Sequence, residues 1–248
     1  MRGGGKKSWL EARFFAVMGV QQTMSPIAKF MLRIPVGLSF LAAMLFVSAG
    51  TLRFWQGWAL MALFFGWVLA AVYLFKRDPQ LLAGRLEIRE KRQEQRRFMS
   101  LALPGIGLVF VIAGLDHRFG WSARLLWPVP LWLMVVSLAL VGGSFAWISW
   151  AMKVNSFASR TIHVMPGQSV VTNGPYRLVR HPMYLGAAVM VFCFALALGS
   201  LVALPASVLL VPLWVFRLLD EEELLRQELP GYTEYCQRTP FRLIPLIW

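Results

Sequence analysis

One apolar run, residues 183–219, limits the possible folds of this chain more than any other feature. Its only charged residue is Arg217, and it is too long for one membrane crossing, for which about 20 residues suffice. The pair Gly199–Ser200 near its middle indicates a turn. The run therefore predicts two antiparallel transmembrane helices, the second of them bent by Pro205 and Pro212.

Four further apolar stretches precede this run, and 58% of the chain is apolar, against about 45–50% for an ordinary soluble domain. We therefore expect an all-α integral membrane protein with about six transmembrane helices, embedded in the lipid bilayer. A helix over residues 9–20 lies either in the membrane interface or against the bundle. Three regions are predicted: an N-terminal segment at 1–33, a membrane region at 34–151 and a catalytic region at 152–248. The membrane region contains four spans, at 34–52, 54–75, 99–115 and 129–151, and the catalytic region contains the helical hairpin at 183–219.

The 25 Lys and Arg residues are distributed unevenly over this topology. All but Arg53, Arg118 and Arg124 fall on one side, which the positive-inside rule assigns to the cytoplasm. Both termini and the active site are then expected on the cytoplasmic face of the inner membrane. A charged loop at 76–100 suits anionic headgroups, with substrate docking as the alternative. Because the charges lie in loops between apolar runs, the net charge of +13 indicates lipid contact and no nucleic-acid partner.

Several common kinds of site have no support in this sequence. The two cysteines, Cys193 and Cys236, lack the partner spacing of a zinc site, and no metal is expected. There is no glycine-rich dinucleotide motif, no P-loop, no His-Glu-x-x-His and no nucleophile elbow. A Rossmann-type dinucleotide domain, a zinc hydrolase and a serine hydrolase are therefore unsupported.

Two polar stretches flank the long apolar run and carry the residues suited to chemistry. Residues 174–186 contain His181 followed by Pro182, which favours a non-helical His and a helix beginning at the proline. Residues 217–235 begin with Arg217 and an acidic cluster, and ionisable residues at the end of an apolar span are usually functional. The hairpin would bring the stretches together into one site. The alternative is an interfacial anchor of Tyr, Arg and His.

A short cytoplasmic β-hairpin is predicted just before the first polar stretch. Residues 161–164 and 169–172 are rich in Thr and Val, and a Pro-Gly turn lies between them. The hairpin would lead directly into the motif that contains His181.

At these residues the chain resembles the isoprenylcysteine carboxyl methyltransferase family, within the wider group of membrane phospholipid methyltransferases. The resemblance covers about residues 155–248. The matching positions are Gly174, Tyr176, Arg180, His181, Pro182, Tyr184, Gly186, Arg217, Glu221, Glu222, Tyr232 and Tyr235.

The resemblance implies an enzyme that uses S-adenosyl-L-methionine (SAM) at the cytoplasmic face without a Rossmann domain. Arg217, Glu221 and Glu222 are then the catalytic candidates, with Arg217 also facing the substrate. The cofactor-binding candidates are Gln168, Ser169, Val170, Val171, Tyr176, His181, Pro182, Met183, Tyr184 and Glu221.

The expected function is methyl transfer to a lipid-like acceptor. The preferred acceptor is the carboxylate of an isoprenylcysteine-type or prenylated small molecule. Such a carboxylate needs no base, and Arg217 can hold it in a bidentate pair. A phospholipid amine, an isoprenoid acid or a small thiol remain alternative acceptors. Two alternatives are not methyltransferases. One is a nicotinamide-dependent membrane reductase, because some sterol reductases have related C-terminal patterns. The other is a non-catalytic scaffold.

Overall fold

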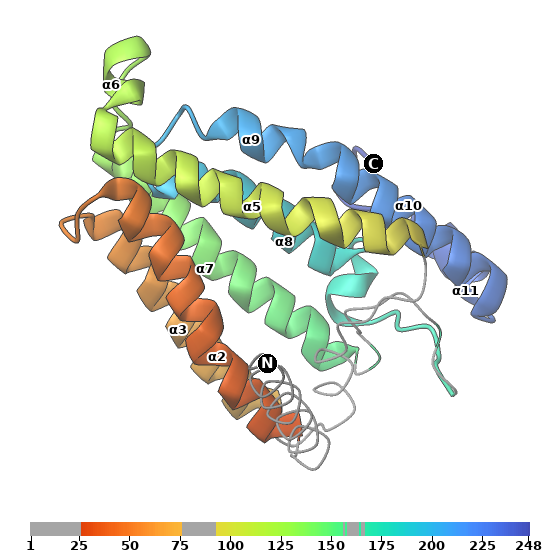
Figure 1. Cartoon of the computed structure of the whole chain (residues 1–248). Coiled ribbons are helices and arrows are strands. Elements are labelled where there is room, and N and C mark those ends of the chain that lie inside the picture. The colour runs from red at the N-terminus through yellow and green to blue at the C-terminus, as the bar shows by residue number, and fades with distance from the viewer. Residues whose placement is uncertain (1–25, 76–92, 156, 158–163, 165–166) are drawn as a thin grey trace, which may run out of the picture.

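The computed structural model describes residues 26–75, 93–155, 157, 164 and 167–248, and every regular element within them is a helix (Figure 1). The predicted N-terminal helix at 9–20 and most of the basic loop at 76–100 lie outside the described residues. In chain order the elements are α2 (Pro26–Ala42), the π-helical η1 (Ala43–Val47), α3 (Trp55–Phe75), α5 (Gln93–Phe119), α6 (Trp121–Leu125), α7 (Leu131–Val154), the 3₁₀-helical η2 (Gly174–Arg177), α8 (Pro182–Ala197), α9 (Leu204–Leu209), α10 (Val211–Glu228) and α11 (Tyr232–Arg238).

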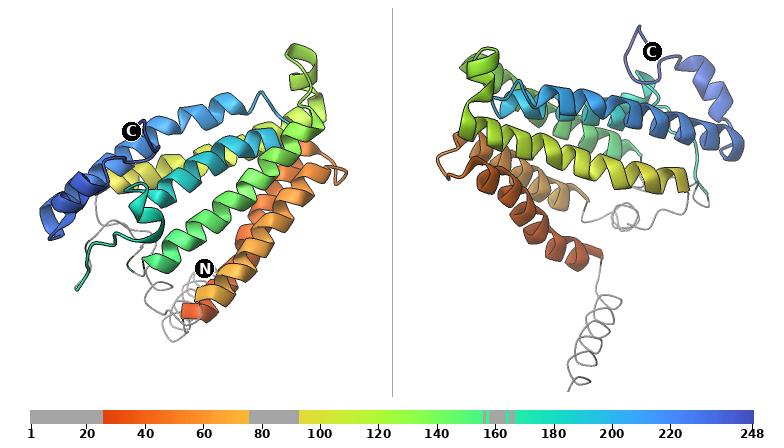
Figure 2. Two further views of the ribbon diagram at one scale, coloured as in Figure 1. Left: turned by 180° about the vertical axis from the view of Figure 1, so that it is seen from behind. Right: turned by 45° about the horizontal axis from the view of Figure 1, so that its top comes forward.

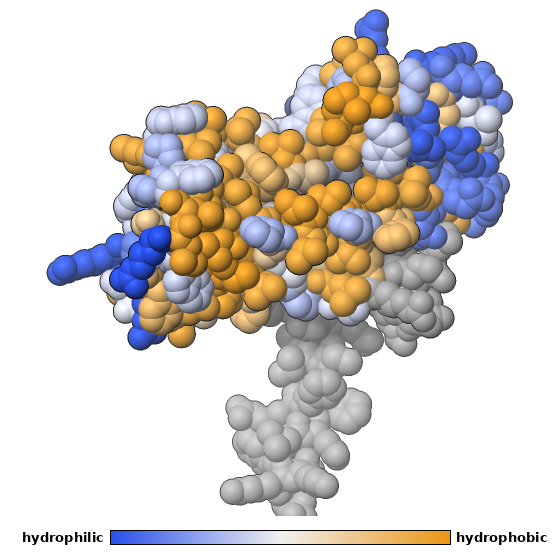
Figure 3. All heavy atoms as spheres, turned by 90° about the horizontal axis from the view of Figure 1, so that it is seen from above, coloured by the Kyte–Doolittle hydropathy of each residue, from blue (hydrophilic) through white to orange (hydrophobic). Residues whose placement is uncertain are grey.

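Three of these helices contain apolar segments long enough to cross a membrane. These segments are Trp55–Leu74, Phe98–Phe119 and Leu131–Val154, whereas the apolar helices Ile34–Val47 and Pro182–Ala197 are shorter. The middle of the face drawn in Figure 3 is apolar, and hydrophilic side chains gather toward its ends. The protein is thus a helical integral membrane protein with three candidate spans in its described part, and six crossings stay a prediction.

The helices form a bundle in which α5, α8, α9 and α10 run side by side (Figures 1 and 2). Helix α7 packs along α8, and α3 packs on α7 with α2 beside it. Rings fill the centre of the core: Phe194 of α8 lies 5.7 Å from Phe64 and 5.0 Å from Phe110, measured between ring centroids. Burial of such large rings gives helices from distant parts of the chain a common core.

The break in the long apolar run lies where the sequence predicts it, but the helix after it differs from the prediction. Gly199 has φ +76°, a conformation that suits glycine, and it ends α8. Pro205 and Pro212 do not bend one long helix; each lies in the first turn of a separate helix, α9 and α10. The third predicted span, 99–115, is also longer than expected, because the apolar segment of α5 continues to Phe119.

The predicted β-hairpin is not present in the described residues. Residues 169–172 have no regular structure, so the predicted second strand is wrong. The predicted first strand, 161–164, lies outside the described residues except for Val164. Val170 and Val171 instead pack against a cluster that contains Tyr176 and Tyr232. Tertiary packing therefore overrides the local strand preference of these valines.

A buried carboxylate joins three elements at the end of α5. Asp116 accepts hydrogen bonds from the Ser122 amide (2.7 Å), from the Ser122 hydroxyl and from the Ser200 hydroxyl (2.5 Å). The Ser122 hydroxyl in turn accepts a hydrogen bond from the Leu201 amide at 2.9 Å. These bonds tie α5 and α6 to the turn between α8 and α9, at the end of α8 away from His181.

Gly114 of α5 packs tightly against Leu45 of η1 and the following Ser48, so replacing it should cost stability. A Cβ atom there would lie 1.9 Å from the Ser48 hydroxyl oxygen and 2.8 Å from the Leu45 carbonyl oxygen. We expect Gly114→Ala to destabilise the protein by about 1–3 kcal/mol, since the backbone must move. Thermal unfolding in detergent measures this loss. Gly143→Ala is the matched control, because no atom lies within 4 Å of the added Cβ; equal melting temperatures for the two variants would contradict the expectation.

Candidate functional site

A cavity of about 360 Å³ lies between the N-terminal halves of α5 and α8, the C-terminal part of α7, one side of α10 and the start of α11. One part of its wall is polar and aromatic, with Tyr176, His181 and Glu221. Another part is apolar and is formed by side chains such as Phe98 and Trp214. The cavity thus presents hydrogen-bonding groups and a lipid-like surface to the same space.

The cavity gathers nearly all the predicted site residues, although their contact with a cofactor stays a prediction. Glu222 does not line it. The predicted residues that do are Gln168, Ser169, Val170, Val171, Tyr176, His181, Pro182, Met183, Tyr184, Arg217 and Glu221.

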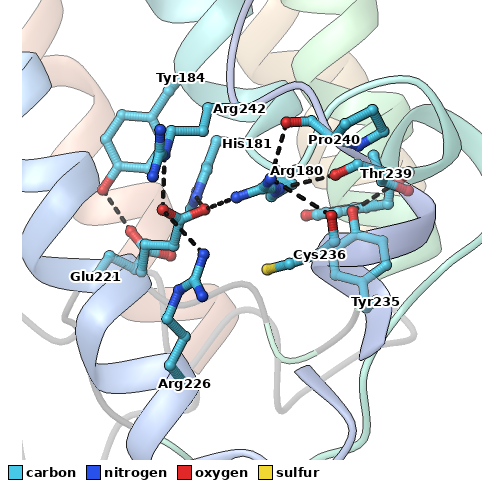
Figure 4. Close-up of polar contacts among 12 residues, drawn as sticks. Arg180, His181, Tyr184, Glu221, Arg226, Tyr235, Cys236, Thr239, Pro240 and Arg242 are labelled. Carbon is cyan, nitrogen blue, oxygen red and sulfur yellow. Dashed lines mark hydrogen bonds and ion pairs between the residues drawn. The ribbon is translucent and has the colours of Figure 1, made fainter. Parts of the chain in front are cut away.

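The Tyr184 hydroxyl connects the two candidate catalytic side chains of α10. It donates a hydrogen bond to Glu221 Oε2 at 2.5 Å and accepts one from Arg217 Nε at 2.9 Å (Figure 4 shows the former). Arg217 and Glu221 are one helical turn apart and therefore share a face of α10. The Arg217 guanidinium also lies 4.8 Å from the centre of the Phe98 ring. A carboxylate, a phenol and a guanidinium thus follow one another along the cavity wall.

Glu222, next along α10, faces a different set of partners. Its carboxylate lies 2.5 Å from Arg180 Nη1 and 2.7 Å from Arg242 Nε, with Arg226 at 3.9 Å (Figure 4). Burial alone would raise the Glu222 pKa, but the hydrogen bonds from Arg242 and Arg180 outweigh it and hold the pKa below its usual value. Glu222 is therefore an ionised anchor for arginines rather than part of the cavity wall.

The C-terminal segment 239–242 holds the first polar stretch in place. The Arg180 and His181 amides donate hydrogen bonds to the carbonyls of Phe241 (2.9 Å) and Arg242 (3.0 Å). The Arg180 side chain also donates to the Thr239 and Pro240 carbonyls, each at 2.8 Å. Sequence reasoning missed Arg242 and this segment, because nothing in a short basic tail indicates which distant backbone it contacts.

His181 lies in the cavity wall as a buried, neutral imidazole. It is not helical (φ −121°, ψ 63°), and α8 begins at Pro182, both as the sequence predicts. Burial lowers the His181 pKa more than the nearby Glu221 and Glu222 carboxylates raise it. Within the described residues, its Nε2 atom is buried and has no hydrogen-bond partner.

Two tyrosines of α11 complete this side of the cavity. The Tyr235 hydroxyl donates a hydrogen bond to the Tyr176 carbonyl at 2.7 Å. The Tyr232 hydroxyl is buried and, like His181 Nε2, has no hydrogen-bond partner among the described residues. Tyr232 belongs to the matched sequence pattern, yet sequence reasoning assigned it no role.

Comparison with known proteins relates this part of the chain to two kinds of enzyme. A family model described as phospholipid methyltransferase matches residues 132–229, from α7 through α10. The C-terminal half therefore carries a phospholipid methyltransferase-like membrane domain. The chain is also 34% identical over 171 residues to the Delta(14)-sterol reductase TM7SF2 of Mus musculus, an alignment that covers 60% of this chain.

The chain spans 41% of the length of that reductase. The names of the two relatives refer to different reactions on lipid substrates: methyl transfer for the matched family and reduction for the sterol reductase. Among the described residues there is no cluster of three or more His, Cys, Asp or Glu side chains that could hold a metal ion.

Proposed function

We propose that the protein is an integral membrane methyltransferase that uses SAM to methylate the carboxylate of a lipid-like, isoprenylcysteine-type acceptor. The observation that carries the proposal is the cavity, in which the Arg217–Tyr184–Glu221 chain runs beside an apolar wall. Such a site suits a polar, cationic cofactor and an apolar acceptor with an anionic end.

The described residues fit SAM in two respects. The Tyr232 hydroxyl is buried in the cavity wall without a hydrogen-bond partner among the described residues, and a buried polar atom is costly unless a ligand or water completes it. Glu221 lines the same cavity and supplies a carboxylate for a cationic group of the cofactor. The remaining predicted cofactor contacts also line the cavity: Gln168 to Val171, Tyr176 and His181 to Tyr184.

Bound SAM would supply an electrophilic methyl group to the acceptor. Arg217 is the group that would hold an acceptor carboxylate, because a guanidinium binds a carboxylate through two parallel hydrogen bonds. The Tyr184 hydroxyl fixes Arg217 relative to Glu221, and Phe98 and Trp214 keep that part of the cavity apolar. Since methyl transfer is an in-line displacement, this positioning supplies most of the catalysis.

Reduction with a nicotinamide dinucleotide is the second candidate, favoured by the similarity to the sterol reductase. The diphosphate of such a cofactor needs cations. In the described part of the cavity wall, Arg180 is paired with the buried Glu222 and Arg217 is bonded to Tyr184, while the Glu221 carboxylate would repel phosphate. The charge of the cavity wall therefore supports SAM. The cytoplasmic placement of the site belongs to the same proposal and depends on the asymmetry of Lys and Arg.

Calorimetric titration of the purified protein in detergent with SAM, its demethylated product S-adenosylhomocysteine (SAH), and NADPH tests this assignment. We expect saturable binding of SAM and SAH, weakened roughly tenfold or more by Glu221→Gln through loss of a charge-assisted hydrogen bond. Glu223→Gln is the matched control, because Glu223 is exposed and its hydrogen bond among the described residues is with Gln227 in its own helix. Binding of NADPH together with no binding of SAM or SAH would overturn the methyltransferase proposal.

A further inference from the structure

Tyr232 offers a buried hydroxyl to which the proposed function assigns no particular bond. It is the first residue of α11 and follows Gly231, whose φ of +82° turns the chain out of α10. Its side chain is 4% exposed and lines the cavity, and it lies outside the region matched by the family model. Nothing in that family match assigns Tyr232 a role.

The ring of Tyr232 is held firmly by its neighbours. It belongs to the buried cluster with Tyr176, Leu229 and Tyr235, and the centres of the Tyr232 and Tyr235 rings are 5.7 Å apart. Packing therefore determines where the hydroxyl lies before any ligand arrives. Burial also raises the Tyr232 pKa, and the nearby Cys236, Glu222 and Glu221 raise it further, so the hydroxyl keeps its proton and can donate it in a hydrogen bond.

The two tyrosines of α11 differ in one respect that decides their roles. The Tyr235 hydroxyl is used within the fold, since it donates to the Tyr176 carbonyl at 2.7 Å. The Tyr232 hydroxyl has no partner in the described part of the chain, although it is equally buried. His181 lines the same cavity, but its buried Nε2 atom lies 4.0 Å from Glu222 Oε1, a carboxylate that does not line it. Tyr232 thus offers a buried donor to a polar ligand in this cavity.

We propose that Tyr232 is a cofactor-binding residue whose hydroxyl donates a hydrogen bond to an acceptor atom in the part of the cofactor common to SAM and SAH. This inference rests on the proposed function. A phenol donor is unsuited to the sulfonium, which is a cation, and suited to a carboxylate, ribose oxygen or adenine nitrogen, all of which both compounds carry. The contact therefore contributes to affinity for both compounds and not to recognition of the methyl group.

Two variants that each remove one hydroxyl test this assignment. The measurements are the dissociation constants for SAM and SAH and the melting temperature without ligand, compared for wild type, Tyr232→Phe and Tyr235→Phe. We expect Tyr232→Phe to weaken binding of both compounds by the same factor, roughly tenfold, for loss of one hydrogen bond. Its melting temperature should stay the same or rise, because the fold loses no bond. Tyr235→Phe should melt at a lower temperature, because the Tyr176 carbonyl loses its donor.

Wild-type affinity in a Tyr232→Phe variant would overturn this inference alone. A fall in its melting temperature equal to that of Tyr235→Phe would do the same, by showing that the hydroxyl serves the fold. Weaker binding of SAM with unchanged binding of SAH would contradict the assignment to the shared part. Wild-type protein that binds neither compound would overturn the methyltransferase proposal and this inference with it.

Discussion

Glu222→Gln is expected to lower the free energy of unfolding by about 3–5 kcal/mol, the usual effect of removing one partner from a buried ion pair. Glu222 is 3% exposed, and its carboxylate compensates Arg180 and Arg242, both of which bond it directly. Gln keeps the shape of Glu222 but leaves the charge of Arg180 buried and uncompensated. In thermal unfolding, such a loss corresponds to a fall in melting temperature on the order of 10 °C.

Glu223→Gln, on the exposed side of the same turn, should melt like wild type. Cofactor affinity should also fall in Glu222→Gln, because Arg180 and the C-terminal segment hold His181. A Glu222→Gln variant as stable as wild type would show that the arginine cluster does not stabilise the fold.

The same carboxylate makes the wild-type protein sensitive to acid. The folded pKa of Glu222 lies below its ordinary value of 4.5, so its stabilisation is present above that pH and is lost as the pH falls through the folded pKa. The folded pKa of His181 lies below 6.5, so the unfolded chain binds more protons as the pH falls below 6.5, and stability falls there too. Melting temperatures measured from pH 7 to about pH 3 should decline in wild type, and Glu222→Gln should abolish the part of this decline below pH 4.5.

Arg217→Met is expected to reduce methyl transfer by on the order of 10²-fold or more, comparable to the loss of a positioned donor in other active sites. Affinity for SAM should change little, since Arg217 is assigned to the acceptor and Glu221 to the cofactor. The measurement is transfer of labelled methyl from SAM to an S-prenylated N-acetylcysteine in lipid vesicles, with phosphatidylethanolamine as the amine-bearing comparison.

Arg217→Lys separates charge from geometry. It keeps a cation but loses the Nε bond to Tyr184 and the planar fork that pairs with a carboxylate, so we expect it to remain well below wild type. Arg177→Met is the control, because Arg177 is exposed on the helix preceding the site. Full turnover in Arg217→Met, or an equal loss of SAM affinity, would contradict the assignment of Arg217 to the acceptor.

The positions of the helices were predictable because hydrophobicity is a local property of the chain. The run at 183–219 turns at Gly199 as predicted, although α9 and α10 take the place of a single second helix. This turn brings Arg180 to Glu222 and Tyr184 to Glu221. The β-hairpin prediction failed in its described part, because Val170 and Val171 are used in packing against the tyrosine cluster instead of in a strand. Short segments of high strand propensity adopt whatever conformation their tertiary neighbours favour.

The sequence alone therefore determined the helical membrane class, the hairpin and the pair of polar stretches that meet at one end of it. The tertiary structure alone decided which of the adjacent carboxylates Glu221 and Glu222 faces the cavity, that Arg242 reaches Glu222, and that Tyr232 is left without a partner in the described fold. The reason is geometric. Consecutive residues of an α-helix point about 100° apart, so the role of each depends on the rotation of α10 about its axis. That rotation is set by packing against α5, α8 and the C-terminal segment, which no local pattern of residues records.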